Sequence, residues 1–261
     1  MQFDCSAIAL SCRRYGEGAA IVHLYTAELG RIAAYVHGGA SRRQAAIWQA
    51  GALVSCHYTS RLPSQLPQVS GETMLETAAF LMDRPAILAM VNALAALIDQ
   101  ALPEGEPQPD FFAETVSTLV ALTRGQGDAA SMAYLRWECA LLQAAGFGLD
   151  LSSCAVTGVT ENLIYVSPKS GRAVCADAAG KWRDRLLPLP GFMLTTSGGP
   201  SDAHVTARDI RDGARLTDYF LAQHVFGARH LPIPSPRQLL QDRLEKAASV
   251  GPGTAENTSQ D

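Results

Sequence analysis

The sequence predicts an α+β protein, with a five-stranded β-barrel of the OB type at the amino terminus and a helical domain after it. Three observations lead to this fold class. Apolar, β-branched and aromatic residues alternate in five short runs within residues 1–75, with glycines between several of them. From residue 76 the apolar residues recur at steps of three and four, which is typical of amphipathic helices. Between about residues 150 and 180 the alternation of strands returns.

The five predicted strands cover residues 8–14, 20–26, 31–37, 53–59 and 68–73. Each is rich in residues that favour extended backbone. Five short strands in about seventy residues are too few for a sandwich, but they suit a small barrel. OB barrels are common platforms for nucleic acids, although a fold alone does not define a function.

The helical domain is predicted to span residues 76–248. A helical stretch is predicted over 73–82. Pro85 opens the first long helix, and two more follow at 111–123 and from Asp128, with Trp137 expected in the core. A loop is predicted at 187–191, and two final helices are expected from about 208 and from 237. Residues 249–261 are small and polar, and are predicted to form a disordered tail.

A β-hairpin with a preceding knuckle is predicted inside this helical domain, at about residues 150–180. A zinc ribbon has such a geometry, with two cysteine pairs around one metal ion. Two of the four cysteine positions are lost here: Cys154 and Cys175 remain, but Thr157 and Ala178 stand three residues after them. Because two thiolates do not complete a tetrahedral site, no bound metal is predicted.

The charges are distributed unevenly. The whole chain has a net charge of −4, but residues 1–70 carry a net charge of +3 and residues 71–140 a net charge of −7. Arginine supplies every basic side chain of the first segment, and its planar group suits phosphate and stacks on bases. A solubilising surface is the alternative interpretation of these arginines. They lie in or beside predicted turns: Arg13, Arg14, Arg31, Arg42, Arg43 and Arg61.

No catalytic motif is evident. The sequence contains neither the GxxxxGK[ST] loop of nucleotide hydrolases nor the GxSxG elbow of serine hydrolases. The six histidines lack metal-ligand spacing, and the six cysteines contain no CxxC pair, so most are expected to be buried thiols. A signal peptide and an uninterrupted apolar stretch of membrane-spanning length are also absent, which predicts a cytoplasmic protein without membrane contact.

Several motifs resemble the RecO family of bacterial recombination and repair proteins. In the predicted barrel they are the glycine turn at 15–18, the segment 24–31 and the turn at 38–43. Further along the chain they are residues 146–158, 165–174 and 186–190. The resemblance covers residues 1 to about 246 in the order of the family, and the middle motifs are the most specific.

The resemblance implies a nucleoid-associated, non-enzymatic protein without a cofactor that binds single- and double-stranded DNA and anneals complementary strands. With RecR and the single-strand-binding protein SSB, such proteins help to load RecA onto SSB-coated DNA. Some members hold zinc with four cysteines in the insert. We expect the six arginines to contact phosphate, and Tyr15 and Tyr35 either to stack on bases or to lie in the core. Candidate cations for the acidic SSB tail are Arg136, Lys169 and Arg172. An RNA-binding OB protein and a partner-binding scaffold remain alternative interpretations.

Overall fold

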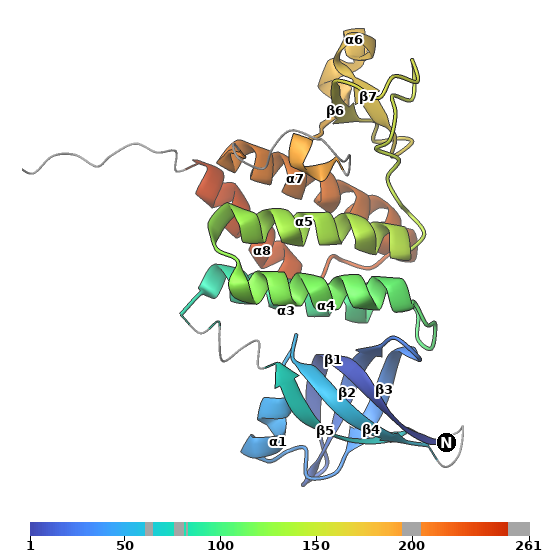
Figure 1. Cartoon of the computed structure of the whole chain (residues 1–261), viewed down its shortest axis with the longest axis vertical. Coiled ribbons are helices and arrows are strands. Elements are labelled where there is room, and N and C mark those ends of the chain that lie inside the picture. Colours follow the sequence, from blue (N-terminus) through green and yellow to red (C-terminus); the bar gives the residue numbers. More distant parts are fainter. Residues whose placement is uncertain (61–64, 76–80, 82, 195–204, 250–261) are drawn as a thin grey trace, which may run out of the picture.

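The computed structural model describes residues 1–60, 65–75, 81, 83–194 and 205–249. It is a mixed α+β structure, elongated along one axis (Figure 1). A five-stranded sheet occupies one end and a small three-stranded sheet the other, with the long helices between them.

The N-terminal sheet consists of β1 (Gln2–Tyr15), β2 (Ala19–Thr26), β3 (Gly30–Val36), β4 (Leu53–Thr59) and β5 (Gln68–Leu75). All five predicted strands are confirmed. They pair in the order β1-β2-β3-β5-β4, and β4 also pairs with β1, so the pairing passes around all five strands. One parallel pair, Tyr35 with Gln68, joins β3 to β5, and the other pairings are antiparallel.

Two strands, β1 and β5, extend at least two residues beyond the predicted limits. β1 starts at Gln2 because its first half pairs with β4, whereas its second half pairs with β2. The helical stretch predicted from Thr73 was wrong at its start, since β5 continues to Leu75 by pairing with Leu53. Residues 76–80 and 82 lie outside the described residues. The domain limits therefore stay a prediction.

A short helix, α1 (Arg42–Ile47), stands where the sequence predicts a turn. Ser41 caps it, because the backbone N–H of Gln44 donates to the Ser41 hydroxyl oxygen at 3.3 Å. None of the six residues of α1 is buried, so this helix has no apolar periodicity from which it could be predicted. Trp48, which follows at once, is fully buried among the strands.

The helical part consists of α3 (Pro85–Ala101), α4 (Pro109–Arg124), α5 (Gly127–Ala144), α7 (Ala207–Phe220) and α8 (Ser235–Ser249). A π-helical turn, Leu221–Phe226, and a 3-10 turn, Gly227–Arg229, extend α7. Trp137 lies in the core as predicted, and its indole N–H donates to Thr115 at 3.0 Å. Among the described residues, no helix is long and apolar enough to cross a bilayer.

One apolar core continues from the helices into the sheet. Ile8 and Leu10 of β1 and Tyr25 of β2 belong to the same buried cluster as the residues of α3, α4 and α5. A second cluster fills the space between the five strands, and its members include Val22, Ala34 and Trp48. The outer face of β1 and β2 is therefore attached to the helices, while the other end of the sheet stays exposed.

The insert contains the predicted hairpin, β6 (Leu163–Val166) and β7 (Ala173–Cys175), which pair in antiparallel fashion. A short helix, α6 (Ala176–Ala179), and a 3-10 segment, η1 (Gly180–Arg185), follow. The loop predicted at 187–191 was partly wrong, because β8 (Leu187–Pro188) pairs with β6 as an edge strand. A strand of two residues is too short for alternation of apolar and polar residues to show in the sequence. A further 3-10 turn, η2 (Gly191–Met193), leads to residues 195–204, which are not described.

Candidate nucleic-acid interface

Three aromatic rings gather where β1 and β3 end. The rings of Tyr15 and Tyr35 meet edge to face with centroids 6.2 Å apart, and His37 lies 4.8 Å from Tyr35. Tyr15 is 58% exposed, so it is not a core residue. The rings border a shallow hollow of about 500 Å³ together with the glycine turn between β1 and β2. Exposed aromatic rings beside a hollow are suited to stacking on bases.

Four of the predicted arginines lie at this end of the sheet or in the helix that follows it, and all four are exposed: Arg13, Arg14, Arg42 and Arg43. Arg13 is opposite Ile21, which in turn is opposite Tyr35, so Arg13 and Tyr35 share one face of the sheet. Arg14 donates to the carbonyl oxygen of Ala40 at 3.3 Å and so links β1 to the segment before α1. The arginines of β1 and α1 are therefore close to the aromatic rings.

Arg31 lies at the opposite end of β3, against the helices. Its Nε donates to the carbonyl oxygen of Leu102 at 3.0 Å, and its guanidinium is 3.6 Å from Asp99. Its side chain is 17% exposed. Gly30 beside it has a φ of +66°, and a Cβ there would collide with the backbone carbonyl of Glu106. The structure thus gives Arg31 partners within the chain, whereas Arg61 lies outside the described residues.

The carboxylate of Asp99 in α3 contacts three side chains of the sheet. It accepts a hydrogen bond from Ser11 at 3.2 Å and lies 2.7 Å from Nδ1 of His23, in addition to its contact with Arg31. The carboxylate is 14% exposed. This group of four side chains fixes the sheet to α3, and it accounts for the position of one predicted DNA-contacting arginine.

We expect the main effect of Arg31→Gln to be a loss of stability and not a loss of DNA affinity. Loss of the charged contacts with Asp99 and Leu102 should lower the free energy of unfolding by about 1–3 kcal/mol, because their partners are partly buried. The matched change Arg42→Gln, at an exposed position, should alter stability by less than about 0.5 kcal/mol but weaken DNA binding. Urea unfolding and oligonucleotide binding of both variants give the comparison, and the opposite pattern would return Arg31 to the DNA-contacting set.

The three candidate cations for an acidic tail lie on two parts of the structure. Arg136 of α5 donates to the carbonyl oxygen of Phe192 at 2.7 Å, and its guanidinium is 5.9 Å from the centroid of the Phe192 ring. Lys169 is exposed in the turn between β6 and β7. Arg172 is also exposed, and its Nε is 3.0 Å from the carboxylate of Asp150. Arg136 and Arg172 thus already have partners within the chain.

Cys154 and Cys175 lie side by side in the insert. The backbone N–H of Cys175 is 3.3 Å from the Cys154 sulfur, and the Thr157 hydroxyl is 3.6 Å from the Cys175 sulfur. Burial tends to raise the pKa of Cys154, but hydrogen bonds from Thr157, Cys175 and Val156 outweigh it and lower the pKa to about 6. The donor set does not fit a tetrahedral zinc ion, because Thr157 and Ala178 supply no thiolate. Among the described residues, no group of three or more His, Cys, Asp or Glu side chains could hold a metal ion.

The fold and this interface define an α+β protein whose N-terminal sheet has one exposed end with basic and aromatic side chains and is attached elsewhere to a helical part with a small embedded sheet. Two family models match the chain: "Recombination protein O N terminal" over residues 1–77, and "Recombination protein O C terminal" over residues 83–231. The chain belongs to the RecO family of DNA repair proteins.

Curated relatives agree with this assignment. The chain is 44% identical over 249 residues to a DNA repair protein RecO of Gluconacetobacter diazotrophicus, with 94% of this chain and 96% of the relative covered. It is 42% identical to those of Granulibacter bethesdensis, with 94% and 96% covered, and Phenylobacterium zucineum, with 96% and 100% covered. The predicted family is therefore confirmed over nearly the whole chain.

Proposed function

We propose that this protein is a non-enzymatic mediator of DNA repair and recombination, and that its N-terminal sheet is an OB-type barrel that binds DNA. The observation that carries the proposal is the contact of Tyr15, Tyr35 and His37 at one end of the sheet, with four exposed arginines on β1 and on the neighbouring helix α1. Arginine can neutralise phosphates without reading the sequence, and exposed rings can stack on unpaired bases of any type. Binding of both single- and double-stranded DNA follows from such contacts.

Strand annealing is the activity that this surface supports best. Two complementary strands repel each other through their phosphates, and a basic surface screens this repulsion while the strands pair. No nucleotide hydrolysis is needed, because base pairing itself provides the driving force. The family resemblance adds three partners to the proposal: RecR, the acidic tail of SSB and, through them, RecA.

The insert is proposed to be a zinc-ribbon-like hairpin that holds its shape without metal. Hydrogen bonds around Cys154, including the one from the backbone of Cys175, join the knuckle to β7. The backbone N–H of Ala155 also donates to the carbonyl oxygen of Ala173 at 2.8 Å. These contacts supply cross-links between the same segments that a metal ion would join.

Annealing of complementary oligonucleotides, both naked and coated with SSB, tests the proposed function. We expect the wild-type protein to accelerate annealing without a nucleotide, and Arg42→Ala/Arg43→Ala to lose most of this acceleration. A wild-type protein that neither binds DNA at low salt nor anneals strands would overturn the proposal and favour a partner-binding scaffold. Stronger binding to RNA than to DNA of the same sequence would favour the RNA-binding alternative.

The proposed SSB contact needs a separate measurement. A peptide with the sequence of the SSB tail should bind the wild-type protein, and Arg136→Ala should weaken this binding if α5 carries the site. A second location is a groove of about 510 Å³ between β1, α3 and α8, which is lined by apolar side chains including Leu88 and Leu239 and by Arg243. Arg243→Ala therefore serves as the paired variant. Full affinity in both variants would leave Lys169 and Arg172 as the candidates.

A further inference from the structure

The outer end of the insert carries an exposed tryptophan. Trp182 of η1 is 51% exposed, whereas the other two tryptophans, Trp48 and Trp137, are 0% and 1% exposed. None of the six residues of η1 is buried. About half of the indole surface is therefore in water, where it is accessible to another ring.

Basic side chains surround this indole. The Lys181 ammonium and the Arg185 guanidinium each lie 5.3 Å from the centroid of the Trp182 ring. Arg183 lies beside them, where its Nε donates to the hydroxyl of Tyr165 at 2.6 Å. With Asp184 as the only acid, the six residues of η1 carry a net charge of +2.

The backbone holds this group of side chains in place from both ends. On one side, Ala179 at the end of α6 is buried. On the other side, Leu187 of β8 pairs with Val166 of β6. The contact between Arg183 and Tyr165 adds a third connection, from η1 to the hairpin. The tryptophan and its cations are therefore presented from a small rigid unit.

We propose that Trp182, with Lys181, Arg183 and Arg185, forms a second contact site for single-stranded nucleic acid. An unpaired base would stack on the indole, and the three cations would contact the adjacent phosphates. This inference rests on the proposed function and adds a surface to it. An aromatic ring among basic side chains is the arrangement by which many proteins bind single strands without sequence preference.

The charges and shape favour a nucleic acid over a protein partner. A protein partner with an apolar anchor would need a pocket to receive it, and the hollows described for this structure are lined by other segments. A base, by contrast, needs only a flat ring. The cations at 5.3 Å can turn from the indole to a phosphate when a base takes their place.

The proposed second site lies at the opposite end of the molecule from the N-terminal sheet. Figure 1 shows α6 and the hairpin at one end of the long axis and the N-terminal sheet at the other. One molecule would therefore contact a strand, or two strands, at both ends, with the helices as a spacer. Two linked weak sites bind a long strand more tightly than either binds alone.

Tryptophan fluorescence tests the proposal directly, because Trp182 is the exposed one of the three tryptophans. Titration with oligo(dT) should quench the emission of the wild-type protein. Trp182→Phe should keep its affinity, since a ring remains, but lose the quenching. Trp182→Ala, and a variant with Lys181, Arg183 and Arg185 changed to glutamine, should bind the same oligonucleotide about 5- to 100-fold more weakly. Arg208→Gln, at another exposed position, is the charge control.

The outcomes separate this inference from the proposed function. If oligo(dT) binds and Arg42→Ala/Arg43→Ala weakens it, but Trp182 is not quenched and both insert variants bind normally, the second site is refuted and DNA binding by the sheet stands. If the wild type binds no oligonucleotide, both fail. If the insert variants bind oligo(dT) normally but lose the SSB-tail peptide, the surface is a protein contact, and the nucleic-acid assignment is wrong.

Discussion

Glu138→Leu is expected to lower the free energy of unfolding by about 3–5 kcal/mol, because it leaves a buried guanidinium without its only fully buried counter-charge among the described residues. Glu138 of α5 and Arg237 of α8 are both 0% exposed, and Nη2 of Arg237 is 3.1 Å from Oε2 of Glu138. For a chain of this size the loss corresponds to a fall in melting temperature of roughly 10 °C.

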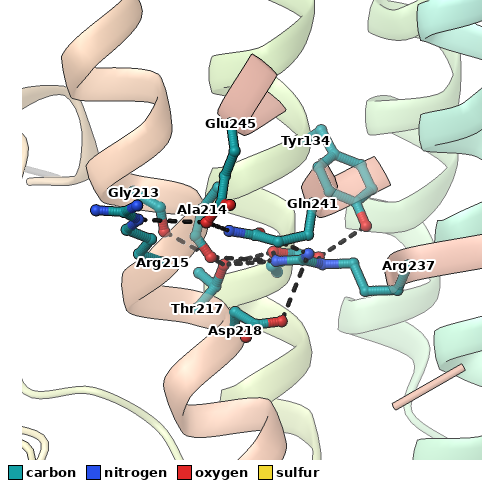
Figure 2. A network of polar contacts seen from close by, with 10 residues as sticks. Tyr134, Gly213, Ala214, Arg215, Thr217, Asp218, Arg237, Gln241 and Glu245 are labelled. Carbon is teal, nitrogen blue, oxygen red and sulfur yellow. Dashed lines mark hydrogen bonds and ion pairs between the residues drawn. The ribbon is translucent and has the colours of Figure 1, made fainter. Parts of the chain in front are cut away.

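The contacts of this pair explain why the cost is large. The Glu138 carboxylate also accepts hydrogen bonds from Tyr134 at 2.7 Å and from Thr217 at 2.5 Å. Arg237 donates to the carbonyl oxygen of Ala214 at 3.2 Å, and Figure 2 shows its guanidinium among side chains of α7 and α8. Burial alone would lower the pKa of Arg237, but Glu138 and its neighbours raise it above the ordinary value. The Arg237 guanidinium also lies 3.7 Å from the Asp218 carboxylate, so the network joins α5, α7 and α8 around one buried cation.

Two further variants make this result interpretable. Glu138→Leu/Arg237→Met should recover much of the lost stability, because no unpaired charge stays buried. Glu245→Gln is the control for an exposed pair: Glu245 lies 3.3 Å from Arg215 at the surface, and its loss should cost less than about 1 kcal/mol. Urea unfolding of the four proteins measures the differences. A cost for Glu138→Leu no larger than that for Glu245→Gln would show that water reaches the pair.

The elements that could be predicted from the sequence are those whose period is long enough to recognise. In the five strands, apolar residues alternate with others over several positions. In the long helices, apolar residues recur at steps of three and four over several turns. The short helix α1 and the two-residue strand β8 show neither, because α1 buries no side chain and β8 depends on pairing with β6. Elements that exist through partners distant in the sequence leave little local signal.

The role of a side chain is equally difficult to predict when its partner is distant in the sequence. The net charge of the first segment predicted a basic surface, and Arg13, Arg14, Arg42 and Arg43 are indeed exposed. Arg31 has the same residue type and a similar position beside a turn, yet Asp99 lies 68 positions away in sequence and 3.6 Å away in space. No local pattern indicates such a partner. The pair of Glu138 and Arg237, 99 residues apart, could not be predicted for the same reason.

The exposure of Trp182 could not be predicted from the sequence either. A single tryptophan between basic residues gives no information about burial, and tryptophan is usually largely buried. Only the structure separates Trp137, which packs against Phe111 with ring centroids 5.9 Å apart, from Trp182, which faces solvent. The same residue type thus serves the core in one place and the surface in the other.

The salt dependence of DNA binding should change most when the four exposed arginines at the sheet end are removed together. Each phosphate contact on single-stranded DNA contributes about 0.7 to the slope of log affinity against log salt, so four contacts account for a slope of roughly 3. A variant with Arg13, Arg14, Arg42 and Arg43 changed to glutamine should lose this part of the slope. At low salt its affinity should fall by about 100-fold or more.

A second variant with the same net charge isolates the effect of position. Changing Arg208, Arg211, Arg215 and Arg243 to glutamine also removes four positive charges, but from α7 and α8. If DNA lies on the sheet end, this control should keep nearly the whole slope, because long-range repulsion alone is screened at about 0.1 M salt beyond roughly 10 Å. Equal loss in both variants would mean that net charge, and not a defined surface, controls binding. Loss confined to the control would move the DNA to the helical part and leave the aromatic rings of the sheet without a role in binding.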